Sequence, residues 1–329
     1  MGQVGYLTLG LSFASIFALP ASSRVVTTQH VSVVLNETLN GLDIKPGGRY
    51  IDGTVGGGGH SEAILASAPD VEVLALDVDP AALERAARRL LPFGSRVKLV
   101  KANFAQMSTV AHANGFDQVD GIVLDLGLSS DQLGDPDRGF GFMAGGPLDM
   151  RFDQTHGLSA DELINQLDQD ELADLIYRYG EEPASRKIAR AIVTARPIHT
   201  ADQLAAVIEK AVGRRGRIHP ATLTFQALRI VVNDELASLM SALPQAAGLL
   251  QSSGRLAVIS FHSLEDRIVK EYFRTAAQEH LPQPDDAPGT AYRSATLRVI
   301  TRKPIVASDA EVLSNPRARS AKLRIAEKL

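Results

Sequence analysis

Cysteine is absent from all 329 residues. Its absence excludes disulfide bonds, thiolate zinc sites and cysteine-held iron–sulfur clusters. Tryptophan is absent too, and aromatic residues make up only 5% of the chain, whereas proteins that bind single strands mainly by stacking usually carry more. The formal net charge is −4, so any nucleic-acid binding has to come from local basic patches.

The rest of the composition is that of a globular protein. Hydrophobic residues make up 45% and charged residues 22% of the chain, which is ordinary for a soluble domain. The length suits one large domain or two smaller ones, each able to bury a hydrophobic core. We therefore expect a cytoplasmic protein without a stable membrane partner.

An uncharged stretch covers residues 4–21. Its length suits a membrane span or the core of a signal peptide, but no lysine or arginine precedes it and it contains Gly10 and Pro20. We expect residues 1–29 to be a disordered extension, or the true start to lie near His30. A signal or an anchor is the alternative.

Apolar, β-branched runs alternate with helical patterns in the first part of the chain. This alternation predicts a parallel sheet with crossover helices. Strands are expected over residues 49–55, 71–78, 97–102 and 120–126, and helices over 61–68 and 81–91. Asp79 and Pro80 suit the N-cap and the first position of the second helix.

The alternation stops at residue 127. Residues 127–157 are rich in Gly, Asp and Pro and contain no recognisable element, which is typical of functional or disordered segments. Residues 159–249 have a helical pattern that opens on a capping box of Ser159 and Glu162. Breaks between helices are expected at Pro183, Pro197, Pro220 and Pro244. Strand patterns return over residues 254–261 and 297–305.

These patterns predict an α/β domain that a helical insert interrupts. The first part of the α/β domain is expected over residues 30–135, and the loop with the insert over 136–236. The second part, with a basic end, is expected over residues 237–329.

A glycine-rich loop joins the first strand to the first helix. Its sequence from Tyr50 to His60 is YIDGTVGGGGH, and consecutive glycines let a ligand approach the backbone closely. The helix N-terminus that follows favours an anionic group. Asp77, at the end of the second strand, is placed to accept hydrogen bonds from ribose hydroxyls. The loop predicts a nucleoside-containing ligand, and a plain turn is the alternative.

The spacing of the glycines distinguishes between cofactors. A dinucleotide fingerprint has the pattern G-x-G-x-x-G, with glycine or alanine at its last position. If the pattern starts at Gly56 its last position is Ser61, and if it starts at Gly57 its last position is Glu62, so neither alignment fits. No lysine lies in or beside the loop, as a P-loop requires. The loop begins with the carboxylate of Asp52, which suits a ligand with cationic groups. We therefore predict S-adenosylmethionine, which carries an ammonium and a sulfonium.

The fourth predicted strand ends at Asp125, within DGIVLDLGLSS. Open α/β sheets bind ligands at the carboxyl ends of their strands. Methyl transfer to an amine needs the nitrogen held in line with the methyl group and an acceptor for its N–H. Asp125 suits that catalytic role or cofactor binding, and capping of the next turn is the alternative.

Seven motifs in order carry a family resemblance. From about His30 to Lys328 the chain resembles the small-subunit ribosomal RNA methyltransferase H family, the MraW type. The motifs are DGTVGGGGHS, DGIVLDLGLSS, RGFGF, PLDMRFD, FQALRIVVNDEL, ISFHSLEDRIVK and NPRARSAKLR. The resemblance implies S-adenosylmethionine-dependent methylation of N4 of a decoding-centre cytidine in 16S rRNA.

The resemblance also implies a fold and a donor site. The fold is a class I, Rossmann-like methyltransferase domain: a seven-stranded, mostly parallel sheet with an antiparallel last hairpin and an inserted helical domain. The donor-site residues carried over are Gly58, Gly59, His60, Asp77, Phe104, Asp125 and Gln132. Two departures from the family pattern matter here. Ser32 stands where the family usually has a proline. Asp131, just before Gln132, also stands where the family usually has a proline.

The segment FHSLEDR contains His262, Glu265 and Asp266, which together suggest a metal site. A capping box of Ser263 and Asp266 at the start of a helix explains the segment better, so no metal is expected. His262 follows a strand and is a candidate to contact the target base.

Basic clusters are candidates for phosphate contacts, the alternative being an ordinary solvated surface. One contains Arg317, Arg319, Lys322 and Arg324, and the other contains three arginines within residues 213–219. RNA specificity would then come from an extruded base in a pocket. Candidates to form that pocket are Arg138, Phe140, Phe142 and Arg151, although the two phenylalanines fit the core of the insert equally well.

The sequence thus predicts an RNA methyltransferase that acts on the small ribosomal subunit. One rival is a dinucleotide-dependent oxidoreductase, against which the failed fingerprint argues. The other is a non-catalytic protein that binds RNA or senses S-adenosylmethionine during ribosome assembly. The oligomeric state is open, with a homodimer among the options.

Overall fold

The computed structural model describes residues 32–142, 145–214, 218–279 and 294–329. Residues 1–29 and the uncharged stretch within them lie outside this part of the chain. Within the described ranges, no helix is long and apolar enough to cross a membrane.

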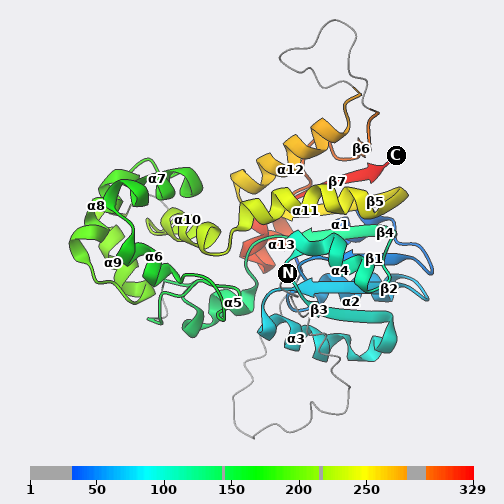
Figure 1. The fold of residues 1–329 in the computed structure, drawn as a ribbon, viewed down its shortest axis with the longest axis horizontal. Helices are drawn as coiled ribbons and strands as arrows, with labels where there is room; N and C mark the ends of the chain where they lie inside the picture. Colours follow the sequence, from blue (N-terminus) through cyan, green and yellow to red (C-terminus); the bar gives the residue numbers. More distant parts are fainter. Residues whose placement is uncertain (1–31, 143–144, 215–217, 280–293) are drawn as a thin grey trace, which may run out of the picture.

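One seven-stranded sheet forms the centre of the molecule (Figure 1), with the order β3-β2-β1-β4-β5-β7-β6. Its strands are β1 (Arg49–Asp52), β2 (Glu72–Asp77), β3 (Val97–Lys101), β4 (Val119–Asp125), β5 (Leu250–Ser260), β6 (Leu297–Val299) and β7 (Lys322–Lys328). The first five strands run parallel, and β7 lies antiparallel between β5 and β6. This topology confirms the predicted class I, Rossmann-like fold.

Helices cover both faces of the sheet. One face carries α4 (Met107–Ala113), α11 (Glu235–Leu249) and α12 (Ser263–Ala276), whose apolar side chains share a core with Ile122 and Leu256. The other face carries α1 (Leu35–Leu42), α2 (Gly59–Ser67) and α3 (Pro80–Leu90), packed on Val73 and Val123. Asp79 caps α3 and Pro80 opens it, as predicted.

Five helices form a separate lobe beside the sheet (Figure 1). They are α6 (Ala160–Gln166), α7 (Gln169–Gly180), α8 (Ser185–Ala195), α9 (Ala201–Val212) and α10 (Thr222–Val232). The lobe has its own apolar core, centred on Ile164, Ile176 and Leu204. Ser159 and Glu162 form the predicted capping box. The helical insert is therefore present.

Two details of the helix prediction were wrong. The stretch expected to lack elements contains α5 (Ser130–Gly134), which a Ser129–Gln132 capping box starts, and the 3-10 helix η3 (Pro136–Arg138). Pro244 lies inside α11 and does not end it. A helix proline loses one backbone hydrogen bond, but the buried side chains of Leu239 and Leu243 before it and Ala246 after it hold the helix on the sheet.

The strand prediction failed at the end of the chain. The expected strand over 297–305 stops at Val299, and Ile305 makes only an isolated bridge to Leu323. The basic segment contains β7, which the residues alone did not indicate. Short elements complete the fold: η1 (Leu91–Arg96), η2 (Phe104–Gln106), α13 (Asp309–Ser314) and η4 (Pro316–Ser320).

Candidate active site

A cavity of about 360 Å³ opens at the carboxyl ends of the parallel strands. Each of the first five strands contributes a residue from its end or from the position just after it: Gly53, Asp77, Ala102, Asp125 and Phe261. Open α/β sheets bind ligands at this edge. The cavity is therefore the candidate active site.

The glycine-rich loop forms one wall of the cavity. Its Gly53 needs to be glycine, because a Cβ there would lie 2.5 Å from Leu124 Cδ2. Gly59 and His60, which open α2, line the cavity, but Gly58 does not. Gly58 has a φ of +83° and packs against Ala86 of α3. Its role is to let the chain turn into α2.

The glycine-rich loop packs closely against Ser32, the first described residue. A Cβ on Gly59 would lie 2.1 Å from Ser32 Oγ. Ser32 also lines the cavity. Ser32, which stands where the family usually has a proline, is thus part of the cavity wall.

Asp77 ends β2 and holds the loop through backbone amides. Its carboxylate accepts hydrogen bonds from the amides of Gly56 and Asp79, both at 2.9 Å. Burial raises the pKa of Asp77 to about 6, although these hydrogen bonds oppose the shift. The side chain lines the cavity and is placed to accept hydrogen bonds from a ligand.

Asp125 lies where β4 leaves the sheet. Its backbone amide donates to Thr54 Oγ1 at 2.7 Å, which ties the strand end to the glycine loop. His60 Nδ1 lies 3.5 Å from Asp125 Oδ2. Burial raises the pKa of Asp125 well above its usual range, and the charges of Asp52 and Glu265 add to this. Asp125 Oδ1 is buried without a hydrogen-bond partner among the described residues, so it can take a donor from a ligand.

Phe104 and Gln132 also line the cavity. Gln132 is buried, and its Nε2 donates to Asp79 Oδ2 at 2.8 Å. The preceding Asp131 is within 3.1 Å of Arg85 Nε through its Oδ2. The carboxylate of Asp131, where the family usually has a proline, is therefore already paired with Arg85. Of the seven predicted donor-site residues, only Gly58 lies off the cavity wall.

Three of the residues predicted to form a base pocket pack elsewhere. Arg138 is 6% exposed, and its Nη1 lies 2.9 Å from Asp79 Oδ2. Phe140 belongs to the core of the insert. Phe142 stacks on His219 at 4.4 Å between ring centroids. None of the three lines the cavity, and the positions of the two phenylalanines match the alternative of core packing.

Two predicted RNA-binding arginines do line the cavity. Arg151 is held by Asp149, whose oxygens accept from its Nε and Nη2. Arg317 Nη1 is buried and has no hydrogen-bond partner in the described ranges. Burial lowers the pKa of Arg317, and the charge of Asp131 partly opposes this. Arg319 is exposed on η4.

Among the described residues, the other members of the basic clusters have acidic partners. Arg324 is buried and makes two hydrogen bonds to Asp266, and Lys322 Nζ lies 3.5 Å from the same carboxylate. In the other cluster, Arg214 pairs with Glu209 at 2.9 Å. Arg215 and Arg217 lie outside the described residues. For Arg324, a phosphate contact is therefore excluded by its buried ion pair.

The start of α12 differs from the prediction by one residue. The N-cap is His262 and the acid of its capping box is Glu265, whereas Asp266 binds Arg324. Glu265 Oε2 accepts hydrogen bonds from the amides of Phe261 at 2.8 Å and His262 at 3.3 Å. Glu265 lines the cavity and His262 lies behind it.

Several lining residues were not predicted: Asn103, Asn233, Asp234, Glu235, Glu265 and Asn315. Asn233 joins the insert to the loop before it, because it accepts from Phe152 N and donates to Met150 O, both at 2.7 Å. The motifs NDEL and NPRARS contain four of the six. Their polar residues beside helix ends were the only available signal.

Comparisons with known proteins agree with one another. The MraW methylase family matches residues 27–329. A protein of Dehalococcoides mccartyi named ribosomal RNA small subunit methyltransferase H is 54% identical over 91% of this chain and 86% of its own length. Proteins of the same name from Thermomicrobium roseum and a Nostoc species are both 50% identical, over 92% and 91% of this chain and 95% and 92% of their own lengths.

Solved structures are more distant. An rRNA methylase from Streptococcus thermophilus is 12% identical, with a TM-score of 0.39 over 90% of this chain and 93% of that one.

Proposed function

The chain belongs to the MraW methylase family, and from this premise we propose that it methylates N4 of a decoding-centre cytidine in 16S rRNA. The methyl donor is S-adenosylmethionine and the substrate is the small ribosomal subunit, which places the reaction in the cytoplasm. The relatives' shared name supports the subunit. The cytidine and its N4 rest on the motif resemblance.

One observation carries the proposal: Asp125 lines the same cavity as the glycine-rich loop, to which its backbone amide is hydrogen-bonded through Thr54. The donor's ribose would bind Asp77, and its adenine would lie against Phe104. Gly59 and His60 would face the methionine part. This arrangement leaves the end of β4 for the acceptor amine, next to the sulfonium methyl.

The chemical step forms a bond from nitrogen to the methyl carbon while the carbon–sulfur bond breaks and sulfur keeps the electron pair. The amine must then lose one proton. The raised pKa of Asp125 suits it to accept that proton once it is ionised. His60 Nδ1, 3.5 Å away, is the next group placed to receive it.

Affinity for S-adenosylmethionine is expected to depend on the ionisation of Asp77. Its pKa is about 6 because burial disfavours the carboxylate, so it loses its charge as pH falls through 6. The Kd should be constant above pH 7 and rise by up to about tenfold per pH unit below 6. Calorimetric titrations between pH 5 and 8 measure this dependence.

The matched control is Asp77→Asn. Its affinity should be weaker at pH 7.5 and should lack the component that titrates near pH 6. A flat profile for the unmodified protein, or an unchanged slope in the variant, would show that Asp77 does not bind the donor.

Arg319 is the exposed arginine of η4, next to the cavity-lining Arg317. If it contacts an RNA phosphate, Arg319→Ala should weaken RNA binding at every sequence. The slope of log affinity against log salt should fall by about 0.7 to 0.9. Lys98→Ala is the control, because Lys98 is exposed near the amino end of β3, away from the cavity. Equal slopes for the two variants would contradict the contact.

Two measurements distinguish the rival functions. An oxidoreductase would bind NAD in calorimetry, whereas a methyltransferase would bind S-adenosylmethionine and transfer its labelled methyl group to small subunits. A non-catalytic protein would bind S-adenosylmethionine and RNA without transferring label. Sedimentation of the free protein distinguishes a monomer from a homodimer.

A further inference from the structure

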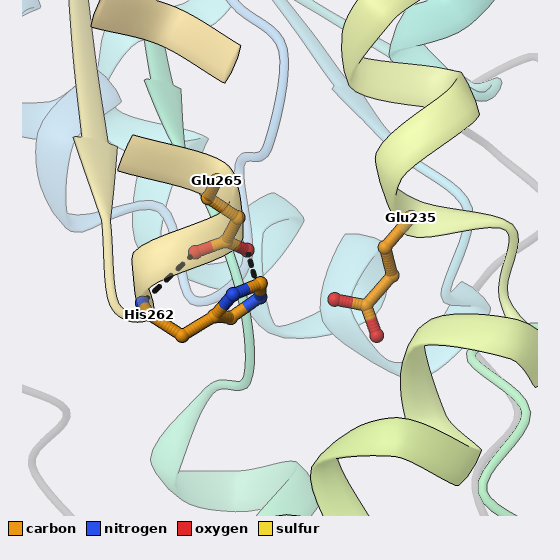
Figure 2. Close-up of side chains that lie close together, drawn as sticks. All are labelled: Glu235, His262 and Glu265. Atoms are coloured by element: carbon orange, nitrogen blue, oxygen red, sulfur yellow. Dashed lines mark hydrogen bonds and ion pairs between the residues drawn. The ribbon is translucent and has the colours of Figure 1, made fainter. Parts of the chain in front are cut away.

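Three side chains that can ligate a metal meet beside the cavity. Glu235 is the first residue of α11, His262 is the N-cap of α12 and Glu265 lies in the first turn of α12. One ligand atom from each lies within 4.8 Å of the other two. In Figure 2 the imidazole ring of His262 lies against the carboxylate of Glu265, and the carboxylate of Glu235 lies across from this pair. The cluster thus joins the end of the insert to the turn after β5.

Water has little access to this cluster. The side chain of Glu235 is 9% exposed, that of His262 is 7% exposed and that of Glu265 is 2% exposed. Buried carboxylates are costly unless cations or hydrogen bonds compensate them. This burial sets the cluster apart from the acidic groups common on protein surfaces.

The imidazole of His262 lacks a complete set of partners. Its Nε2 lies 3.2 Å from Glu265 Oε1, but neither Nε2 nor Nδ1 makes a hydrogen bond within the described part of the chain. Buried polar atoms are nearly always satisfied. An unsatisfied Nε2 next to the carboxylate of Glu265 points to a missing ligand.

Arginine supplies one positive charge to the two carboxylates. Arg229 binds Glu235 with both arms of its guanidinium, at 2.7 and 2.8 Å. Within the described residues, Glu265 pairs with no lysine or arginine and instead accepts from two backbone amides. One guanidinium against two carboxylates leaves one negative charge, which a protonated His262 or a bound cation would neutralise.

We propose that Glu235, His262 and Glu265 bind a divalent transition-metal ion, Zn²⁺ or Mn²⁺. One imidazole nitrogen and two carboxylate oxygens form a donor set that suits these ions. Bond lengths near 2.1 Å place ligand atoms about 3.0 to 3.4 Å apart, and the His262–Glu265 pair already has this spacing. Glu235 is the third ligand, with an oxygen within 4.8 Å of the ligand atoms of His262 and Glu265.

Arg229 can stay hydrogen-bonded to Glu235 when an ion binds. Each carboxylate oxygen has two lone pairs, so Glu235 can bind an ion while Arg229 stays bonded behind it. Metal-ligating carboxylates commonly have such outer partners. The ion would lie at the cavity wall, because Glu235 and Glu265 both line the cavity. It would fix the end of the insert against the β5–α12 turn.

The test uses the full chain after treatment with a chelator. Calorimetric titration with Zn²⁺ and, separately, with Mn²⁺ is expected to show one ion per chain with micromolar or tighter affinity. Bound metal should raise the melting temperature, because it binds only the folded state. His262→Gln should remove this site. His199→Gln is the matched control, because its exposed imidazole pairs with Asp161, and it should bind like the unmodified chain.

A second measurement needs no substitution. With ¹⁵N-histidine labelling, Zn²⁺ should shift the ring signals of one histidine, and that histidine should be the one missing in His262→Gln. The proposal is overturned if neither ion binds, or if the His262→Gln variant binds as tightly as the unmodified chain. No readout uses methyl transfer, so the proposed function and this site stand or fall separately.

Discussion

Replacing Asp125 with asparagine is expected to lower kcat for methyl transfer by about 10²- to 10⁴-fold, which is the usual contribution of a positioned proton acceptor. The amide cannot take the proton that the methylated amine releases. The local fold should survive, because Thr54 Oγ1 binds the backbone amide of residue 125 and not its side chain. Single-turnover kinetics with small ribosomal subunits and labelled donor measure the effect.

Asp120→Asn is the matched control. Asp120 lies near the other end of β4, where its Oδ2 accepts from the amide of Arg49 at 2.9 Å, and it does not line the cavity. Its kcat should stay within about twofold of the unmodified value. If Asp125→Asn raises KM for the donor and leaves kcat unchanged, Asp125 holds the cofactor and does not act on the acceptor.

Arg138→Met is expected to destabilise the protein by about 3 to 5 kcal/mol, because it leaves the buried Asp79 carboxylate without its guanidinium partner. Asp79 is 1% exposed and keeps only the hydrogen bonds from Gln132 and from the first turn of α3. Arg138 also donates to the carbonyl oxygens of Arg151 and Phe152, so the loop before the insert should loosen. Urea unfolding measures the loss.

Two comparisons show where that free energy comes from. Adding Asp79→Asn to Arg138→Met should recover part of the stability, because no buried charge then stays unpaired. Arg319→Ala, at an exposed position, should change stability by less than about 0.5 kcal/mol. Unchanged stability of Arg138→Met together with weaker RNA binding would restore the role in a base pocket that the sequence suggested.

The sheet was predictable where burial requires apolar runs. The strands β2 and β4 are covered on both faces, and their centres are the apolar runs VLAL and GIVL. The strand β7 escaped prediction because its buried positions include Arg324 and Glu327. Asp266 neutralises Arg324, and Arg255 and Arg298 neutralise Glu327. These ion-pair partners come from segments distant in the chain, so the local sequence of β7 does not reveal that its charged residues are buried.

The candidate site was predictable only in part, for a similar reason. Asp77 and Asp125 end parallel strands, and the carboxyl ends of such strands converge on one edge. Asn233, Glu235 and Asn315 reach the cavity from the insert and the last segment, which strand topology alone cannot place. Arg138 was a reasonable candidate by residue type. The position of its side chain depends on its ion pair with Asp79, which lies 59 residues earlier in the chain.

We propose that Asp125 and the glycine-rich loop form the donor site of a methyltransferase for 16S rRNA. The most direct measurement supplies methyl-labelled S-adenosylmethionine and small subunits that lack the modification, then digests the RNA and identifies the labelled nucleoside. We predict label in N4-methylcytidine from one decoding-centre position, and none with Asp125→Asn. Label in another nucleoside would contradict the proposed substrate, and bound donor with no label in the RNA would contradict catalysis itself.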